Sequence, residues 1–371
     1  MLNKYNFLLA VIRNNIVCVI AAIAAALTMI FVPPDSEYLG YFDFKTLTCL
    51  FCVLAVVCAL RNIRFFYTLA RKVVEKFKNL RAAVLALVYI TFIGSMLIAN
   101  DMALLTFLPL GFFVLHTTGK GKYMAFTYIM QNIAANLGGM LTPFGNPQNL
   151  YLYSKFNISD GEFVLIMLPP FLLSVALITL CCFVFVRPEP LELEEDGYKT
   201  PLPKLIVYLV LFALSILIVF RGIPYIVGLI VIPLALLFLD RRALLNVDYG
   251  LLLTFVFFFI FSGNMGRIEI VRDFFSALLE KSTLIVSTLS CQVISNVPTA
   301  ILLSQFTDNY RELLLGVNIG GAGTLIASLA SLITFRAYTS TNPGKAGGYI
   351  LKFSAFNFAF LGILLLFCYF I

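Results

Sequence analysis

Two segments of an otherwise apolar sequence gather residue types that could hold a solute. Residues 136–150 read NLGGMLTPFGNPQNL and residues 318–332 read NIGGAGTLIASLASL, so each combines a Gly-Gly pair with side-chain amides or hydroxyls. Glycine and proline interrupt helices, and an interrupted helix exposes backbone amides and carbonyls that must line a polar cavity or contact a ligand. Because amide ends suit anions and carbonyl ends suit small cations, both segments predict a binding site for a solute or an ion.

Two shorter motifs lie upstream and share an asparagine. LIANDMALL (97–105) aligns with VISNVPTAI (293–301), which pairs Asn100 with Asn296. The ungapped alignment of the longer segments pairs Asn136 with Asn318 and matches the Gly-Gly pair and the following Thr. The candidate residues for binding a substrate or an ion are Asn100, Asp101, Asn136, Gly138, Gly139, Thr142, Pro143, Gly145, Asn146, Pro147, Asn149, Ser295, Asn296, Thr299, Asn318, Gly320, Gly321, Thr324, Ser328 and Ser331.

The elements that must position these residues are membrane helices. The 371 residues are 61% hydrophobic and only 12% charged, with a mean hydropathy of +0.97, whereas soluble domains are about 25% charged. Apolar runs of helical spanning length recur from end to end, which predicts an all-α polytopic membrane protein. We expect about nine crossings, at 8–32, 46–63, 123–153, 163–186, 205–220, 223–239, 249–262, 312–335 and 349–371, and two re-entrant hairpins, at 82–115 and 283–306.

Charge predicts the orientation of these spans. With the N-terminus inside, 19 of the 26 lysine and arginine residues fall on the cytoplasmic side, as the positive-inside rule expects. The C-terminus then lies outside, and the two hairpins enter from opposite faces. We therefore expect a multi-pass protein of the cytoplasmic membrane.

The order of elements repeats within the chain. Each half runs amphipathic helix (64–80 and 267–282), hairpin, broken helix and final span. The first repeat is expected at 1–187, a cytoplasmic linker at 188–204, a connecting span at 205–222 and the second repeat at 223–371. Equivalent elements are an odd number of crossings apart, so the repeats are inverted. This architecture is typical of secondary transporters, whose sites lie near the membrane midplane.

Asp101 is the one acidic residue of 19 that this topology places at membrane depth. A carboxylate there is costly and is by default a functional hypothesis. We expect it to bind or release the coupling ion, H⁺ or Na⁺, with Asn100, Asp101 and Asn296 as a candidate sodium site. The alternative is that Asp101 caps the second arm of its hairpin.

The four motifs resemble the signatures of the ion transporter superfamily, which includes divalent anion/sodium symporters, citrate transporters, arsenite permeases and NhaD-type sodium/proton antiporters. In the symporter branch, Ser-Asn-Thr motifs at the hairpin tips and the loops of the broken helices bind sodium and substrate carboxylates. The resemblance implies those roles for residues 99–101, 295–297, 138–149 and 320–331. Asp101 and Val297 replace the motif threonines, so a two-sodium dicarboxylate mechanism does not transfer directly.

Other function classes fit less well. One His and one deep Asp exclude the residue sets of intramembrane metalloproteases and aspartyl proteases, and we expect no enzyme, no metal centre beyond the sodium candidate and no cofactor. We expect transport of a small inorganic or organic anion, with the lipid bilayer as partner, no nucleic acid and, as often in the superfamily, a homodimer. A sodium/proton antiporter, an arsenite-type permease and an ion channel remain alternatives. Pro143, Gly145, Asn146 and Pro147 have no like residues opposite, so we expect more ligand contacts from the first half.

Overall fold

The computed structural model describes residues 16–191 and 201–371, and these ranges are helical apart from turns and one isolated bridge between Asn79 and Pro190. The start of the first expected span (8–15) and most of the linker (192–200) lie outside the described residues. The α-helices are α2 (Ile16–Phe31), α3 (Phe44–Asn62), α4 (Phe65–Val74), α5 (Leu80–Ile98), α6 (Asn100–Thr117), α7 (Met124–Gly138), α8 (Pro147–Lys155), α9 (Asp160–Phe185), α10 (Leu202–Val219), α11 (Tyr225–Leu239), α12 (Arg241–Leu245), α13 (Tyr249–Arg267), α14 (Glu269–Lys281), α15 (Thr283–Ile294), α16 (Asn296–Leu303), α17 (Tyr310–Ile319), α18 (Leu329–Thr341) and α19 (Ala346–Tyr369). Short 3₁₀ turns are η1 (Ser36–Tyr41), η2 (Gly121–Tyr123) and η3 (Gly139–Leu141).

The outer helices present apolar side chains to their surroundings. Leu165 on α9, Phe238 on α11 and Leu351 on α19 are each more than 70% exposed, as expected where lipid replaces water. Seven helices of the described chain are long and apolar enough to cross a membrane: α3, α5, α6, α9, α10, α13 and α19. The all-helical polytopic fold predicted from the sequence is confirmed.

Two spans are interrupted where the glycines predict it. The expected span at 123–153 consists of α7, η3 and α8, and the one at 312–335 consists of α17 and α18 with turns between them. Helix α7 lies at the centre: of its 15 residues all but Phe126 are buried. The polar side chains of α7 are therefore inside the protein, where each needs a partner.

The two hairpins differ in size. The arms α5 and α6 have 19 and 18 residues, whereas α15 and α16 have 12 and 8. The first hairpin thus extends from residue 80 to 117, slightly beyond the expected 82–115. Each hairpin turns at one residue with positive φ, Ala99 (φ 64°, ψ 149°) and Ser295 (φ 74°, ψ 159°). This backbone region is nearly exclusive to glycine, so both tips hold strained non-glycine residues.

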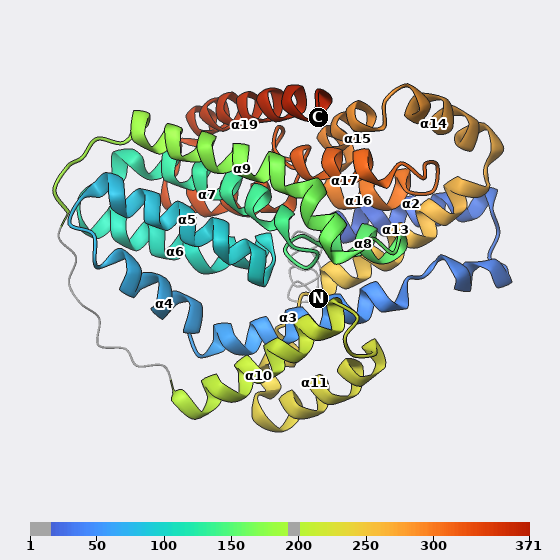
Figure 1. Ribbon diagram of the computed structural model, residues 1–371, viewed down its shortest axis with the longest axis horizontal. Coiled ribbons are helices and arrows are strands. Elements are labelled where there is room, and N and C mark those ends of the chain that lie inside the picture. The colour runs from blue at the N-terminus through green and yellow to red at the C-terminus, as the bar shows by residue number, and fades with distance from the viewer. Residues whose placement is uncertain (1–15, 192–200) are drawn as a thin grey trace, which may run out of the picture.

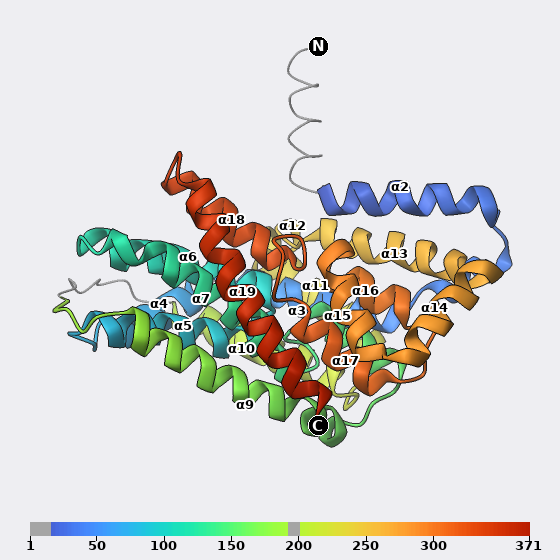
Figure 2. The same cartoon turned by 90° about the horizontal axis from the view of Figure 1, so that it is seen from above.

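Equivalent helices of the two halves each pack against the opposite half. Helix α8, the second part of the first broken helix, packs on α16 and α17, while its counterpart α18 packs on α6 and α7. Figure 1 shows α5, α6 and α7 on the left and α15, α16 and α17 on the right, with α8 among the latter; Figure 2 shows α18 reaching the side of α6. Likewise α2 packs on α13, and α11 on α3. Each half therefore completes the core of the other.

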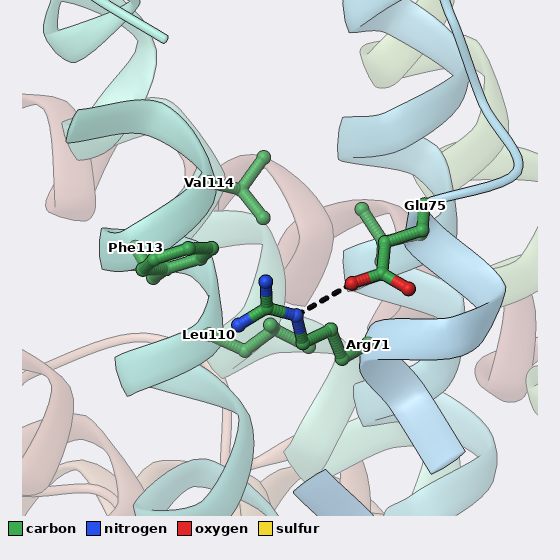
Figure 3. Close-up of a pocket in the computed structure, with 6 residues that line it drawn as sticks. Arg71, Glu75, Leu110, Phe113 and Val114 are labelled. Atoms are coloured by element: carbon green, nitrogen blue, oxygen red, sulfur yellow. Dashed lines mark hydrogen bonds and ion pairs between the residues drawn. The ribbon is translucent and has the colours of Figure 1, made fainter. Parts of the chain in front are cut away.

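The amphipathic helices lie beside the hairpins. Helix α4 contacts α5 and α6, and α14 contacts α15. Arg71 of α4 places its guanidinium 4.6 Å from the Phe113 ring centroid of α6 and pairs with Glu75 at 2.6 Å, as Figure 3 shows. The helix expected at 64–80 ends at Val74, and the expected end of the segment belongs to α5, which Asn79 caps through the Arg81 and Ala82 amides.

Glu189, in the connection after α9, forms hydrogen bonds to the base of the first hairpin and to the start of α7. Glu189 accepts hydrogen bonds from Lys120 (2.7 Å), Lys122 (2.8 Å) and Tyr123 (3.0 Å). Its backbone carbonyl also accepts the Leu80 amide at 2.8 Å. The side-chain hydrogen bonds from Lys120, Lys122 and Tyr123 lower the pKa of Glu189 to about 2. Glu189 thus holds both hairpin arms through charge-assisted bonds.

The strained tips predict that Ala99→Gly stabilises the protein. Relief of about 1–3 kcal/mol of strain exceeds the entropy of about 0.4–1 kcal/mol that glycine adds to the unfolded chain. Thermal unfolding of the purified variant should therefore show a higher midpoint. The control Ala103→Gly removes the same methyl inside α6 and should lower the midpoint. A lower midpoint for Ala99→Gly would contradict strain at the tip.

The low pKa of Glu189 predicts a pH dependence of stability. A carboxyl group whose pKa is depressed by folding stabilises the folded state fully above its ordinary pKa of 4.5, and this contribution disappears as the pH falls towards about 2. Glu189→Gln should therefore unfold at a lower temperature than the parent at pH 7, and the difference should narrow below pH 4.5. Glu280→Gln, which removes an exposed carboxylate from α14, controls for net charge. A pH-independent difference would refute the contribution of ionised Glu189.

Candidate functional site

Each hairpin tip is bonded to the helix break of its own half. The Asn100 amide donates to the Gly145 carbonyl at 3.1 Å, and the Asn296 amide donates to the Ala327 carbonyl at 3.0 Å. The alignment of the two long segments pairs Gly145 with Ala327, so these two hydrogen bonds are equivalent. The tips therefore lie at the depth of the breaks and satisfy carbonyls that a continuous helix would have used.

A second equivalent pair of bonds fixes each break to the first arm of its hairpin. The Thr142 hydroxyl donates to the Met96 carbonyl at 2.7 Å, and the Thr324 hydroxyl donates to the Gln292 carbonyl at 3.0 Å. The first glycine of each Gly-Gly pair also faces that arm: a Cβ on Gly138 would come within 2.3 Å of the Phe92 carbonyl oxygen. At Gly320 the nearest side-chain atoms belong to Cys291. These two glycines permit close packing of the broken helices on the hairpins.

Hydrogen bonds cross between the halves in a reciprocal pattern. Asn146 of the first break donates to Asn318 Oδ1 at 3.1 Å, and Ser328 of the second break donates to Asn136 Oδ1 at 2.8 Å. Because Asn136 aligns with Asn318 and Asn146 with Ser328, each bond is the symmetry counterpart of the other. The centre of the protein is thus a pseudo-two-fold junction between the two breaks.

Further amides and hydroxyls extend this junction. Asn318 also donates to Asn149 Oδ1 at 2.6 Å, and Asn132 donates to the Ser331 hydroxyl at 3.3 Å. The tip residue Asn100 donates to Asn136 Oδ1 at 3.2 Å, so the first tip belongs to the same network. The members are at most 3% exposed. The result is a buried cluster of neutral polar groups, which we call the central amide cluster (Asn100, Asn132, Asn136, Asn146, Gln148, Asn149, Asn318, Ser328 and Ser331).

Three atoms of the central amide cluster have no hydrogen-bond partner within the described chain. They are Asn136 Nδ2, Asn146 Oδ1 and Gln148 Oε1, all from the first half. A buried polar atom without a partner is unfavourable by about 1–3 kcal/mol, so such atoms invite a ligand. One donor and two acceptors could serve a solute with both kinds of group. All three belong to the half from which the sequence predicts more ligand contacts, and that expectation stays a prediction.

Four helix N-termini converge on the cluster. Helices α6 and α16 begin at the two tips, and α8 and α18 begin directly after the two breaks. The hydrogen bonds from tip to break and across the junction connect these four ends. The N-terminus of a helix carries partial positive charge, so the cluster favours negative charge without contributing a lysine or arginine of its own.

Asp101 lies two residues beyond Ala99, at which the first hairpin turns. Its Oδ1 atom is buried without a hydrogen-bond partner, and no side-chain cap of α6 by Asp101 is formed. The Asp101 amide instead donates to Asn100 Oδ1 at 3.0 Å, just as the Val297 amide donates to Asn296 Oδ1 at 2.9 Å. The side chain is therefore available for another partner. Arg61 Nη1 donates to Sδ of the neighbouring Met102 at 3.7 Å. This contact brings one cation near this end of the cluster.

The remaining candidate residues have supporting positions. Thr299 donates to the Ser295 carbonyl at 2.7 Å, within the second hairpin. Pro147 is the first residue of α8, where its missing amide removes no helix bond. Pro143 lies within the first break beside Thr142, and a Cβ on Gly139 would clash with Asn146 Oδ1. A Cβ on Gly321 would come within 3.6 Å of Asn136 Oδ1 from the other half.

Two glutamines are absent from the candidate residues named from the sequence. Gln148 lies within residues 138–149, for which the family resemblance implied a binding role, and its proximity to Asn149 could have singled it out. Gln292 bonds the Gly320 and Ala322 carbonyls through Nε2 at 2.9 and 3.1 Å, and accepts the Thr324 amide at 2.9 Å. It aligns with Met96, so the repeat gave no signal for it. The polar break of the second half thus depends on a side chain that the first half lacks.

Comparison with known proteins identifies the family. A citrate transporter family model (CitMHS) matches residues 6–310. An uncharacterized transporter of Methanocaldococcus jannaschii is 33% identical over 311 residues, 83% of this chain and 84% of the relative. The inner membrane protein YbiR of Escherichia coli is 29% identical over 304 residues, 79% of this chain and 80% of the relative. A silicon efflux transporter of Oryza sativa is 28% identical over 200 residues, 49% of this chain and 40% of the relative.

These matches confirm the resemblance seen in the four motifs. Two of the relatives are named as transporters, and two helix breaks around a buried polar cluster are consistent with such a protein. The chain belongs to the citrate transporter family of membrane transporters.

Proposed function

We propose that the protein is a secondary active transporter that moves a small anion, a carboxylate or an oxyanion, across the cytoplasmic membrane by alternating access, coupled to protons or sodium. The observation that carries the proposal is the junction of two inverted helix breaks by the crossed hydrogen bonds of Asn146 and Ser328. Sites of this kind lie near the midplane in secondary transporters. The cytoplasmic N-terminus and external C-terminus expected from the distribution of basic residues remain part of the proposal.

The chemistry of the central amide cluster supports an anion. Four helix N-termini supply partial positive charge and the free Asn136 Nδ2 supplies a donor, and the low dielectric of a buried site strengthens their interaction with negative charge. The free carbonyl oxygens of Asn146 and Gln148 suit a cation that accompanies the anion. A coupled pair of opposite charges would also lower the electrostatic penalty of crossing the bilayer.

Cation antiport is the second candidate, because the buried Asp101 Oδ1 atom has no partner. In that case, sodium and protons would compete for Asp101 and no anion would be required. Sodium pulses given to proteoliposomes containing a pH-sensitive dye measure this directly. Proton release without any added anion would favour antiport over anion transport.

The proposed function is tested by uptake into proteoliposomes. Citrate, succinate, sulfate and arsenite are offered with and without proton and sodium gradients, and thermal stabilisation of purified protein ranks their binding. We expect saturable uptake of at least one anion that depends on a gradient. Ohmic current instead of saturable uptake would indicate a channel, and no uptake of any anion would refute the proposal.

The position of Asp101 predicts the effect of Asp101→Asn. The substitution keeps the shape of the side chain but removes the group that would exchange H⁺ or Na⁺. We expect uptake to lose its dependence on the proton or sodium gradient, while the anion still stabilises the purified protein against heat. Asp273→Asn, on the exposed face of α14, serves as the control and should leave coupling unchanged. Uptake by Asp101→Asn with the pH and sodium dependence of the parent would eliminate this role.

A further inference from the structure

A second polar cavity lies apart from the central amide cluster. Its volume is about 430 Å³, and it is bounded by the start of α3, the end of α8 and the C-terminal part of α13. Its lining includes Lys45, Lys155, Ser154, Tyr151 and Gln305. The cavity therefore gathers ammonium, hydroxyl and amide donors from segments that are far apart in the sequence.

The two lysines of the cavity have no acceptor partner in the described chain. Neither Lys45 nor Lys155 forms an ion pair or a side-chain hydrogen bond there; Lys45 is half-buried, whereas Lys155 is exposed. The lining carboxylate Asp43 is already bonded to the amide and hydroxyl of Thr46, as the cap of α3. An unpaired ammonium in a partly enclosed wall favours an anion that can approach it.

The charges around the cavity leave this preference in place. Arg221 interacts electrostatically with Lys45 and adds positive charge. Asp43 acts electrostatically on both Lys45 and Lys155, and Asp308 acts on Lys155, without an ion pair to either lysine. Arg267, which donates to the Tyr41 hydroxyl at 3.1 Å, is itself paired with Asp35 at 2.7 Å. The lining thus holds two ammonium groups, Lys45 and Lys155, against one carboxylate, Asp43, and its charge within the described residues is net positive.

One face of α8 connects the cavity with the central amide cluster. Lys155, Tyr151 and Gln148 follow at spacings of four and three residues, so they lie on the same side of the helix. Seven residues of helix span about 10 Å. Tyr151 is buried between them: its ring lies 5.6 Å from that of Phe259, and its hydroxyl lies 2.9 Å from Ser304 Oγ. Because Ser304 donates to Ile301, Tyr151 is the donor in that bond.

We propose that this cavity is an external vestibule in which Lys45 and Lys155 capture a small anion before it passes Tyr151 to the central amide cluster. The inference rests on the proposed anion transport. It adds a second binding site, the cavity, and places Tyr151 between that site and the central amide cluster. The vestibule would raise the local anion concentration, as clefts of one charge sign do.

The potential of the cavity is measured independently of any transported substrate. Ser154→Cys is labelled from outside whole cells with membrane-impermeant thiosulfonates, one anionic and one cationic, and the parent chain gives the background of the eight native cysteines. We compare the labelling rates of the two reagents before and after Lys45→Gln and Lys155→Gln are introduced together. By Coulomb's law for two nearby charges, we expect the ratio of the anionic to the cationic labelling rate to fall about tenfold. The difference should vanish at about 1 M salt.

The capture step is measured by uptake of sulfate and citrate. In the variant that carries both Lys45→Gln and Lys155→Gln, we expect KM for uptake to be at least about fivefold higher at low salt. The maximal rate of uptake should stay within about a factor of two of the parent. Lys155→Arg keeps the charge and should keep KM, while Lys281→Gln, an exposed lysine at the end of α14, controls for net charge. Vesicles of phosphatidylcholine alone ensure that no anionic lipid headgroup occupies the cavity.

The outcomes separate the vestibule from the proposed function. An unchanged reagent ratio, labelling only from the inside, or an unchanged KM would each overturn the vestibule, while uptake by the parent would still support anion transport. If the parent takes up neither sulfate, citrate nor any other tested anion, the proposed anion transport is refuted. The ratio of anionic to cationic labelling then decides by itself whether the cavity attracts anions. A changed ratio together with a raised KM supports the capture step.

Discussion

The structure depends on one constraint: backbone groups freed by an interrupted helix cannot be left facing lipid. Both broken helices meet this constraint in the same way, since the tip residues Asn100 and Asn296 donate to the break carbonyls of Gly145 and Ala327. The close packing of Gly138 and Gly320 and the crossed bonds of the central amide cluster all require the tips to be in place. A hairpin in each half is therefore a structural requirement of the breaks as well as an element of the site.

The tips and breaks also bear on how the proposed transport could work. Strain is concentrated at single residues, Ala99 and Ser295, whereas the hairpin arms are anchored at their bases by Glu189 in the first half and by α14 in the second. In the proposed alternating access, anchored arms would hold the site while one part of the protein moves against the other around it, as in transporters with inverted repeats. The vestibule and Tyr151 would then lie on the path that opens to one side.

Fold and site could be predicted from the sequence to different extents. Apolar length predicted the spans within a few residues, and glycine with proline predicted both breaks, because these signals are local. Helix α4 was expected to extend to residue 80 but ends at Val74, and the cap at Asn79 begins the next helix, α5, at Leu80. Gln292 could not be predicted, since its counterpart is Met96 and its role arises only where hairpin and break meet.

The sequence by itself determined which residues are polar at membrane depth, where the helices break, and that the two halves repeat. It did so because burial of backbone groups in lipid leaves few alternatives for such segments. Only the tertiary structure decided that Asn146 bonds Asn318 while Ser328 bonds Asn136, that Asp101 leaves an oxygen without a partner, and that Lys45 and Lys155 share a cavity. These facts depend on the exchange of α8 and α18 between the halves, a long-range packing that no local pattern encodes.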